Sequence, residues 1–208
     1  GSPYSASAHE IGVRSLRHLA LDYLLAAQSA SLTQAEQLLE SADNLTDRLA
    51  ALRWIAQYAN GAQREQTLAN FYDRWKRESL VVNQWFTVQA TRPDISCVES
   101  VRVLLNHDAF DWRNPNKVRS VISIFANQSL VNFHREDGAG YALLADAVIR
   151  LNSSNPQIAS RLLTPLTKWQ RLVPTLSQLM KAELQRIMHQ GNLSKDVYEV
   201  VSKSLGTS

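Results

Sequence analysis

Two arginines follow Asn-Pro pairs at a similar distance along the chain. Asn114-Pro115 precedes Arg119, and Asn155-Pro156 precedes Arg161. Asparagine is among the best residues to begin a helix because its side-chain oxygen accepts a free backbone N–H, and proline suits the next position. A helix that begins this firmly can hold a guanidinium group, which binds carboxylates through parallel N–H donors, in a fixed direction. Taken alone, the pattern is more typical of two helix starts in a bundle than of a binding site.

The histidines lack the spacing of a catalytic metal site. A helical zinc hydrolase needs His-Glu-x-x-His, whereas His9-Glu10 is followed by Val13 where the second histidine would stand. His18 and Asp22 share a helix face, a pair more typical of solvated side chains than of metal ligands. We expect His134 to hydrogen-bond the backbone of its own loop rather than to polarise a nucleophile. Since no Gly-x-Ser-x-Gly, phosphate-binding glycine loop or paired cysteines occur either, we predict no catalytic, metal or cofactor site in this chain.

The composition is that of a helical domain with a substantial core. The chain has 208 residues, 45% of them hydrophobic, with seven glycines and six prolines, and so few turn residues disfavour an all-β fold. Its 22 basic and 19 acidic residues leave a net charge of +3 without long runs of one sign, so we expect no nucleic-acid partner. Trp54, Trp75, Trp85 and Trp169 could stack on bases but lie on apolar stripes, and we expect them in the core.

Cysteine usage and hydropathy favour a cytoplasmic location. The single cysteine, Cys97, excludes an internal disulfide, fits a reducing compartment, and is predicted to be a small buried apolar side chain. No apolar stretch approaches the roughly 18 residues of a membrane span. Residues 1–8 carry no signal peptide and are expected to be flexible, with Gly1-Ser2 interpreted as a cloning remnant.

Apolar spacings of three and four predict helices through most of the chain. In the segment 9–27 one stripe combines several apolar side chains, and a stripe of this kind normally faces a core; its members are Val13, Leu16, Leu19, Ala20, Tyr23, Leu24 and Ala27. Ser31 and Asp43 are predicted to begin the next two helices, and Asn60-Gly61 to end the third. The segment 80–90 has β-branched residues suited to a strand, but it lacks a partner strand, so we predict a buried helix. Further helices are expected at 62–76, 96–106, 115–126, 140–151, 156–163, 172–189 and 194–204.

Helices in short antiparallel succession, without a strict repeat, predict an all-α fold. We expect an irregular α-solenoid of stacked antiparallel helical hairpins, similar to HEAT and armadillo arrays. Residues 9–208 are predicted to form a single domain that folds as one cooperative unit. Any internal boundary is expected near Arg92-Pro93.

Several segments carry a more specific pattern of residues. In chain order they are 41–52 (SADNLTDRLAAL), 71–75 (FYDRW), 82–90 (VNQWFTVQA), 107–111 (HDAFD), 114–119 (NPNKVR), 133–134 (FH), 137–141 (DGAGY), 155–161 (NPQIASR) and 193–199 (LSKDVYE). Their ordered series resembles the C-terminal helical domain of bacterial aminopeptidase N, the zinc-dependent alanyl aminopeptidase family. The resemblance runs from about Ile11 to Leu205.

The resemblance implies an accessory role in a larger enzyme. In that family the zinc ligands and the substrate-amine site belong to an upstream catalytic domain, so this chain alone is expected to be inactive. The helical domain packs over the catalytic domain, encloses the active-site chamber and limits access to small peptides and unfolded chain ends. The expected partners are therefore the upstream catalytic domain of the same polypeptide and peptide substrates.

Three residues are assigned to peptide binding by the same resemblance. The residues that match Arg119, Gln157 and Arg161 face the chamber and contact the peptide on the primed side of the scissile bond. The arginines could hold a peptide carboxylate near helix starts, and Gln157 could bond a peptide amide. The alternative is that Arg119 and Arg161 pair with acidic residues inside the solenoid.

Two other classes of function compete with this interpretation. A free-standing helical-repeat adaptor that binds a protein or peptide has the solenoid pattern as its only support. A nucleic-acid-binding array rests on the slight basic excess and the aromatic residues, and it predicts binding that weakens steeply with salt.

Overall fold

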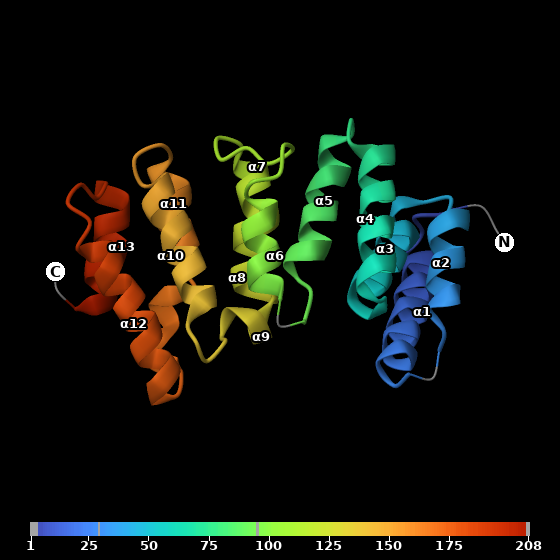
Figure 1. The fold of residues 1–208 in the computed structure, drawn as a ribbon, viewed down its shortest axis with the longest axis horizontal. Helices are drawn as coiled ribbons and strands as arrows, with labels where there is room; N and C mark the ends of the chain where they lie inside the picture. The colour runs from blue at the N-terminus through green and yellow to red at the C-terminus, as the bar shows by residue number, and fades with distance from the viewer. Residues whose placement is uncertain (1–3, 29, 95, 207–208) are drawn as a thin grey trace. The chain divides into compact units, whose positions relative to one another are not determined.

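Every described element of the chain is a helix, which confirms the all-α prediction. The computed structural model describes residues 4–28, 30–94 and 96–206, and Figure 1 shows the helices in succession. They are α1 (Ala8–Ala26), α2 (Leu32–Ser41), α3 (Leu45–Tyr58), α4 (Gly61–Trp75), α5 (Ser79–Ala90), α6 (Cys97–Leu104), α7 (Pro115–Val118), the π-helical η1 (Arg119–Ser123), α8 (Ile124–Gln128), α9 (Leu130–Phe133), α10 (Ala139–Leu151), α11 (Pro156–Leu162), the 3-10 helix η2 (Leu166–Arg171), α12 (Pro174–Met188) and α13 (Lys195–Leu205). None of the described helices is long and apolar enough to cross a membrane.

The chain divides into two compact units, residues 1–89 and 90–208. The division falls at the end of α5, three residues before Arg92. Folding of the whole chain as one cooperative unit stays a prediction.

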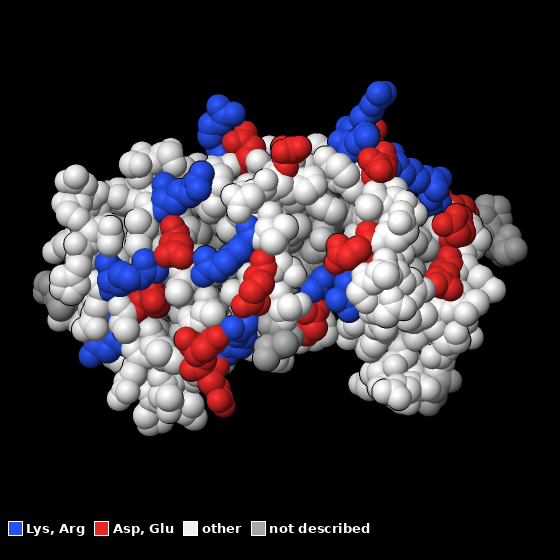
Figure 2. Space-filling view, in the orientation of Figure 1, with Lys and Arg blue, Asp and Glu red and all other residues white. Residues whose placement is uncertain are grey.

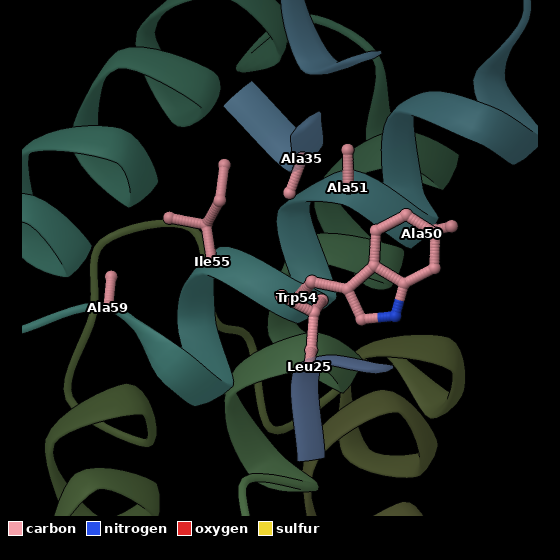
Figure 3. Packing of buried hydrophobic residues seen from close by; sticks show 7 residues of the cluster. All are labelled: Leu25, Ala35, Ala50, Ala51, Trp54, Ile55 and Ala59. Carbon is pink, nitrogen blue, oxygen red and sulfur yellow. The ribbon is translucent and has the colours of Figure 1, made fainter. Parts of the chain in front are cut away.

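The first unit is built around α3. A core cluster brings together small and large apolar side chains from α1, α2, α3 and the residue after α3, which Figure 3 shows: Leu25, Ala35, Ala50, Ala51, Trp54, Ile55 and Ala59. The small residues of α2 and α3 let these two helices approach closely. The segment 80–90 is the helix α5 as predicted, and Trp85 in it donates from Nε1 to the carbonyl oxygen of Leu68 at 2.9 Å.

The orientation of α1 differs from that of an ordinary amphipathic helix. Its apolar stripe is on the outside, with Leu16 69% and Tyr23 70% exposed. Polar side chains face α3 instead, where His18 Nε2 lies 2.7 Å from an oxygen of Asp47. Burial would raise the pKa of the Asp47 carboxyl, but hydrogen bonds from Arg17, Asn44 and His18 hold that pKa below its usual value.

Two helix boundaries in this unit differ from the predictions. Asn44, not Asp43, begins α3, since Asn44 Oδ1 accepts the backbone N–H of Asp47 at 2.9 Å. Asp43 instead accepts the backbone N–H of Tyr4 at 3.2 Å. Asn60 does not end α3 but begins α4, because its side chain accepts the backbone N–H of Gln63 at 3.0 Å. Asn44 and Asn60 both have extended backbone, in which the side chain reaches forward to the first turn.

The second unit contains irregular helices that the periodicity missed. The predicted helix 115–126 is a sequence of three segments, α7, η1 and α8. The short elements α9 and η2 were not predicted, because four to six residues carry too little periodicity to be recognised. Cys97 is fully buried, as predicted, and this burial raises the pKa of its thiol.

Aromatic packing joins α8, α9 and α10. Phe133 lies edge-on to Phe125 and to Tyr141, with ring centroids 6.1 and 5.2 Å apart. Gly140 allows this approach, because a Cβ atom at that position would lie 2.7 Å from the backbone oxygen of Asn132. Trp54 and Trp85 are buried as predicted, whereas Trp75 and Trp169 are only partly buried.

Candidate functional site

The segment before Arg119 begins as the sequence predicts. Asn114 caps α7, and its Oδ1 accepts the backbone N–H groups of Asn116 at 2.9 Å and Lys117 at 3.4 Å. Pro115 occupies the first helical position. The Arg119 side chain is exposed, and its Nη1 donates to Asn116 Oδ1 at 3.0 Å. The loop and the first turn thus orient the guanidinium group from one side.

Arg119 also opens the π-helical turn η1. Val121 and Ile122 of this turn are fully buried, and Ser120 Oγ donates to the carbonyl oxygen of Lys117 at 2.9 Å. A π turn widens the helix locally and occurs frequently at functional sites. Here it fixes the backbone of Arg119 to the core while the side chain of Arg119 points outward.

The second predicted arginine, Arg161, lies in the last turn of α11, a helix that begins in the same way as α7. Asn155 caps this helix by accepting the backbone N–H of Ile158 at 3.2 Å, and Pro156 occupies the first helical position. Gln157 and Arg161 are four residues apart, so they lie on one face of α11. Both side chains are exposed, while Ile158 and Ala159 between them are buried.

The three predicted site residues occupy two elements of the same unit. Figure 1 draws the starts of α7 and α11 at the same edge of that unit. Gln157 and Arg161 are neighbours on α11, and no hydrogen bond or ion pair joins Arg119 to either of them within the described residues. The structure therefore places two of the residues together and the third on a separate helix start.

Within the described part of the chain, neither Arg119 nor Arg161 has an acidic partner. Ion pairs in this unit include Arg92 with Asp94 and Arg186 with Asp146, but none involves Arg119 or Arg161 across the described ranges 4–28, 30–94 and 96–206. The alternative that both arginines pair with acids inside the solenoid is thus not what the structure shows. The caps have also taken the first free backbone amides of α7 and α11. An anion at this edge would therefore meet the guanidinium groups rather than open helix starts.

A second group of charged residues, not predicted from the sequence, lies on the same unit. Arg150 stacks over Trp112, with its Cζ 4.4 Å from the ring centroid, beside a cavity of about 320 Å³. Arg102 and Asp146 also line this cavity, 3.6 Å apart at their charged atoms. Trp112 is the one tryptophan outside the predicted apolar stripes. That exception in the sequence could have indicated that Trp112 belongs to a surface site and not to the core. Figure 2 shows basic and acidic side chains interspersed over the face it draws.

The His134 cluster is neutral and internal. His134 Nδ1 lies 2.8 Å from the hydroxyl oxygen of Tyr141, so the predicted bond from its side chain to loop backbone is wrong. Burial lowers the pKa of His134 and raises the pKa of Tyr141 to about 12, which keeps both groups uncharged near neutral pH. The neighbouring Asp137 is instead paired with Arg135, and its Oδ1 accepts the backbone N–H of Ala139 at 3.0 Å.

The described residues hold no set of ligands that fits a metal ion. Among the residues that the structure describes, no group of three or more His, Cys, Asp or Glu side chains could hold a metal ion. His18 bonds Asp47, and Asp22 accepts from Trp54 Nε1, so the weak pair noted in the sequence is engaged in packing α1 on α3.

Comparison with known proteins assigns the chain to a family. A family described as a domain of unknown function (DUF3458_C) with ARM repeats matches residues 1–206. The chain belongs to the DUF3458_C family. Its ARM repeats agree with the solenoid of helical hairpins predicted from the periodicity.

Three bacterial proteins called aminopeptidase N are similar to this DUF3458_C domain over nearly its whole length. Aminopeptidase N of Haemophilus influenzae is 40% identical over 202 residues, which cover 97% of this chain and 23% of that protein. Aminopeptidase N of Caulobacter vibrioides is 39% identical over 98% of this chain and 24% of its own length. Aminopeptidase N of Escherichia coli is 38% identical over 98% of this chain and 23% of its own length.

A solved structure has the same fold. Aminopeptidase A of Legionella pneumophila, crystallised in complex with aspartic acid, superimposes with a TM-score of 0.89 and 28% identity over 100% of this chain. This domain covers 25% of that chain. It therefore spans about a quarter of the length of each relative that it matches.

Proposed function

We propose that this chain is the C-terminal accessory domain of a cytoplasmic zinc aminopeptidase, an enzyme that removes N-terminal residues from peptides. In this proposal the domain encloses the active-site chamber and limits which substrates enter. It carries no catalytic residue of its own. Support comes from the relatives called aminopeptidase N and from the quarter of their length that the chain spans.

The proposed peptide binding rests on the exposure of Arg119 and Arg161 and on the ion pairs that they do not make among the described residues. Arg119 and Arg161 are exposed and have no acidic partner in the described part of the chain, whereas several other arginines of the unit are paired. An exposed guanidinium group on a short helical segment that an asparagine caps matches a carboxylate through two parallel hydrogen bonds. The carboxylate of a short peptide, on the primed side of the scissile bond, is the proposed ligand.

Gln157 has the complementary chemistry for the peptide backbone. Its amide group can donate to a carbonyl and accept from an N–H. It stands one turn before Arg161 on the same face of α11, so one peptide end can contact both side chains. Arg119, on the separate element η1, would bind the same peptide only if the peptide extends between η1 and α11.

Zinc is assigned to the part of the enzyme outside this chain. The described residues offer no set of ligands for it. When zinc is bound in the proposed catalytic domain, it would activate the water that attacks the scissile amide. The residues of this chain would position the peptide and exclude water.

The proposal is tested with Arg161→Ala in the full-length enzyme. Loss of one charge-assisted contact should cost about 1–3 kcal/mol, which lowers kcat/KM for short peptides by roughly 5- to 150-fold. Amino-acid arylamides have no distal carboxylate, so their hydrolysis should be unchanged. Arg171→Ala is the matched control, because Arg171 is also an exposed arginine of this unit. Equal losses on peptides and arylamides would show that Arg161 is structural.

The gating role needs a separate experiment. The upstream part of the encoding gene is expressed alone, and alanyl-peptide hydrolysis is measured with increasing amounts of this chain. A saturable change in rate or in peptide-length preference is expected. No change, together with no physical association of the two pieces, would refute the accessory role and favour the adaptor interpretation.

A further inference from the structure

The outer face of α1 is apolar along most of the helix. Large side chains on it are between 46% and 70% exposed, and small apolar residues fill the spaces between them. The large ones are Val13, Leu16, Leu19, Tyr23 and Leu24, and the small ones are Ala20 and Ala27. Exposed apolar residues are normal when they occur singly, but a contiguous patch marks an interaction surface. We call these seven residues the α1 patch.

The inner face of the same helix carries the polar groups. Arg17 and His18 both bond Asp47 of α3 at 2.7 Å, and Asp22 pairs with Arg53 at 3.1 Å. Leu21 and Leu25 add the apolar part of that contact. The helix is therefore anchored through its polar side, and its more apolar side stays unused within this unit.

A shallow groove extends the α1 patch toward α3. It has a volume of about 350 Å³, and Leu19 and Tyr23 line it together with Gln57 and Tyr58. A ridge of side chains from another helix can pack into such a groove beside an apolar stripe. The shape and the chemistry of this surface thus fit a helix with an apolar face.

We infer that the α1 patch is the docking surface for a helical repeat that lies earlier in the same polypeptide. Solenoid repeats contact their neighbours on both sides, and terminal repeats need a polar outer face to stay soluble. The α1 patch has the apolar character of an internal repeat. The relatives are about four times as long as this chain, so most of a polypeptide of that length lies outside it.

A second copy of the chain fits this surface less well. From Val13 to Ala27 the patch extends about 21 Å along a helix about 10 Å wide, a footprint well below the roughly 800 Å² per partner of a standard interface. A neighbour in the same polypeptide needs no such area, because its effective concentration is already in the millimolar range. This inference rests on the proposed function only in taking the chain as part of a longer protein.

The test measures how fast a thiol on the patch is alkylated. Leu16→Cys and Val103→Cys are matched variants, since Leu16 is 69% and Val103 is 70% exposed and both lie on helices. The native Cys97 is fully buried and gives a low background. Each variant is made in the 208-residue chain and in the full-length polypeptide, and mass spectrometry of peptides gives the alkylation rate at each site.

The expected result is protection of the patch only in the longer protein. Leu16→Cys should react at least tenfold more slowly in the full-length polypeptide than in the 208-residue chain, while Val103→Cys should react alike in both. Rates for Leu16→Cys within twofold of each other would overturn the inference. So would protection that disappears on dilution together with a change from dimer to monomer, because a second copy would then be the occupant. Neither readout depends on peptidase activity, so failure of the gating proposal remains distinguishable.

Discussion

Gly140 offers the sharpest test of how the second unit is packed. A Cβ atom there would lie 2.7 Å from both the carbonyl oxygen of Asn132 and the Cα of Phe133, and closer still to the carbonyl oxygen of Phe133. Carbon–oxygen contacts in proteins are normally about 3.3 Å or longer. Gly140→Ala therefore requires the backbone at the end of α9 to move by at least about 0.6 Å relative to α10 to relieve the contact with Asn132, and by more to relieve the contact with Phe133.

The two effects of this substitution have opposite signs. Overpacking costs about 1–3 kcal/mol, and the upper value applies because the obstructing atoms are backbone and cannot rotate away. Alanine in place of glycine within a helix returns at most about 1 kcal/mol. Gly140→Ala should therefore lower the free energy of unfolding by about 2 kcal/mol, which corresponds to a fall in Tm of about 4–8 °C for a chain of this size.

Gly12→Ala is the matched control, measured by the same calorimetric scans. Gly12 is also a helical glycine, but among the described residues no atom beyond its chain neighbours and the adjacent backbone of α1 lies within 4 Å of the position of its added Cβ. Only the helix-propensity effect remains, so Gly12→Ala should raise Tm by up to about 4 °C. If both substitutions raised Tm, the close approach of α9 and α10 at Gly140 would be refuted.

Other predictions concern caps and protonation. Asn44→Ala should lower the free energy of unfolding by about 1 kcal/mol, while Asp43→Ala should change it much less, and urea unfolding giving the reverse ranking would restore Asp43 as the cap. Tyr141→Phe should cost about 1 kcal/mol at pH 8, because it leaves His134 Nδ1 buried without its hydroxyl partner; an unchanged urea midpoint would contradict this. Because burial lowers the pKa of His134 in the folded protein, the neutral histidine contributes fully to the free energy of unfolding above about pH 6.5. That contribution is lost as the pH falls and the histidine becomes protonated. His134→Asn should flatten the decline of the urea midpoint between about pH 6.5 and 5, with His107, whose pKa burial also lowers, accounting for the rest; parallel curves would assign the whole decline elsewhere.

Local signals in the sequence were sufficient where one residue decides the geometry. Asn114 and Asn155 begin their helices as predicted, because each is followed by a proline that fixes the first turn. The same rule could not choose between Asp43 and Asn44, since adjacent residues of equal capping ability differ only in what else they contact. In the structure Asp43 is engaged with the backbone of Tyr4, which no local pattern reveals.

Tertiary contacts explain the other differences. The periodicity of α1 showed which residues form a stripe but not which side of the helix packs on α3. The π turn η1 and the partnership of His134 with Tyr141 depend on neighbours that come from other parts of the fold. For the candidate site, the sequence supplied Arg119, Gln157 and Arg161, and the structure added that their side chains are exposed and that the two arginines have no acidic partner among the described residues.

The two unused surfaces of this chain differ in what it costs to leave them uncovered. A charged group is costly to remove from water but not to leave in it, so the exposed Arg119 and Arg161 can stay without a ligand between substrates at little cost. Exposing an apolar surface such as the α1 patch to water costs about 25 cal/mol for each Å². The patch is therefore suited to a permanent neighbour and the arginines to a transient ligand. Polar substitutions in the α1 patch should destabilise the full-length protein without changing its preference among peptides. Arg161→Ala should change the preference among peptides and leave the stability of the protein unchanged. Thermal unfolding and peptide kinetics on the same two variants separate the roles, and a shared effect on both readouts would show that the two surfaces act as one.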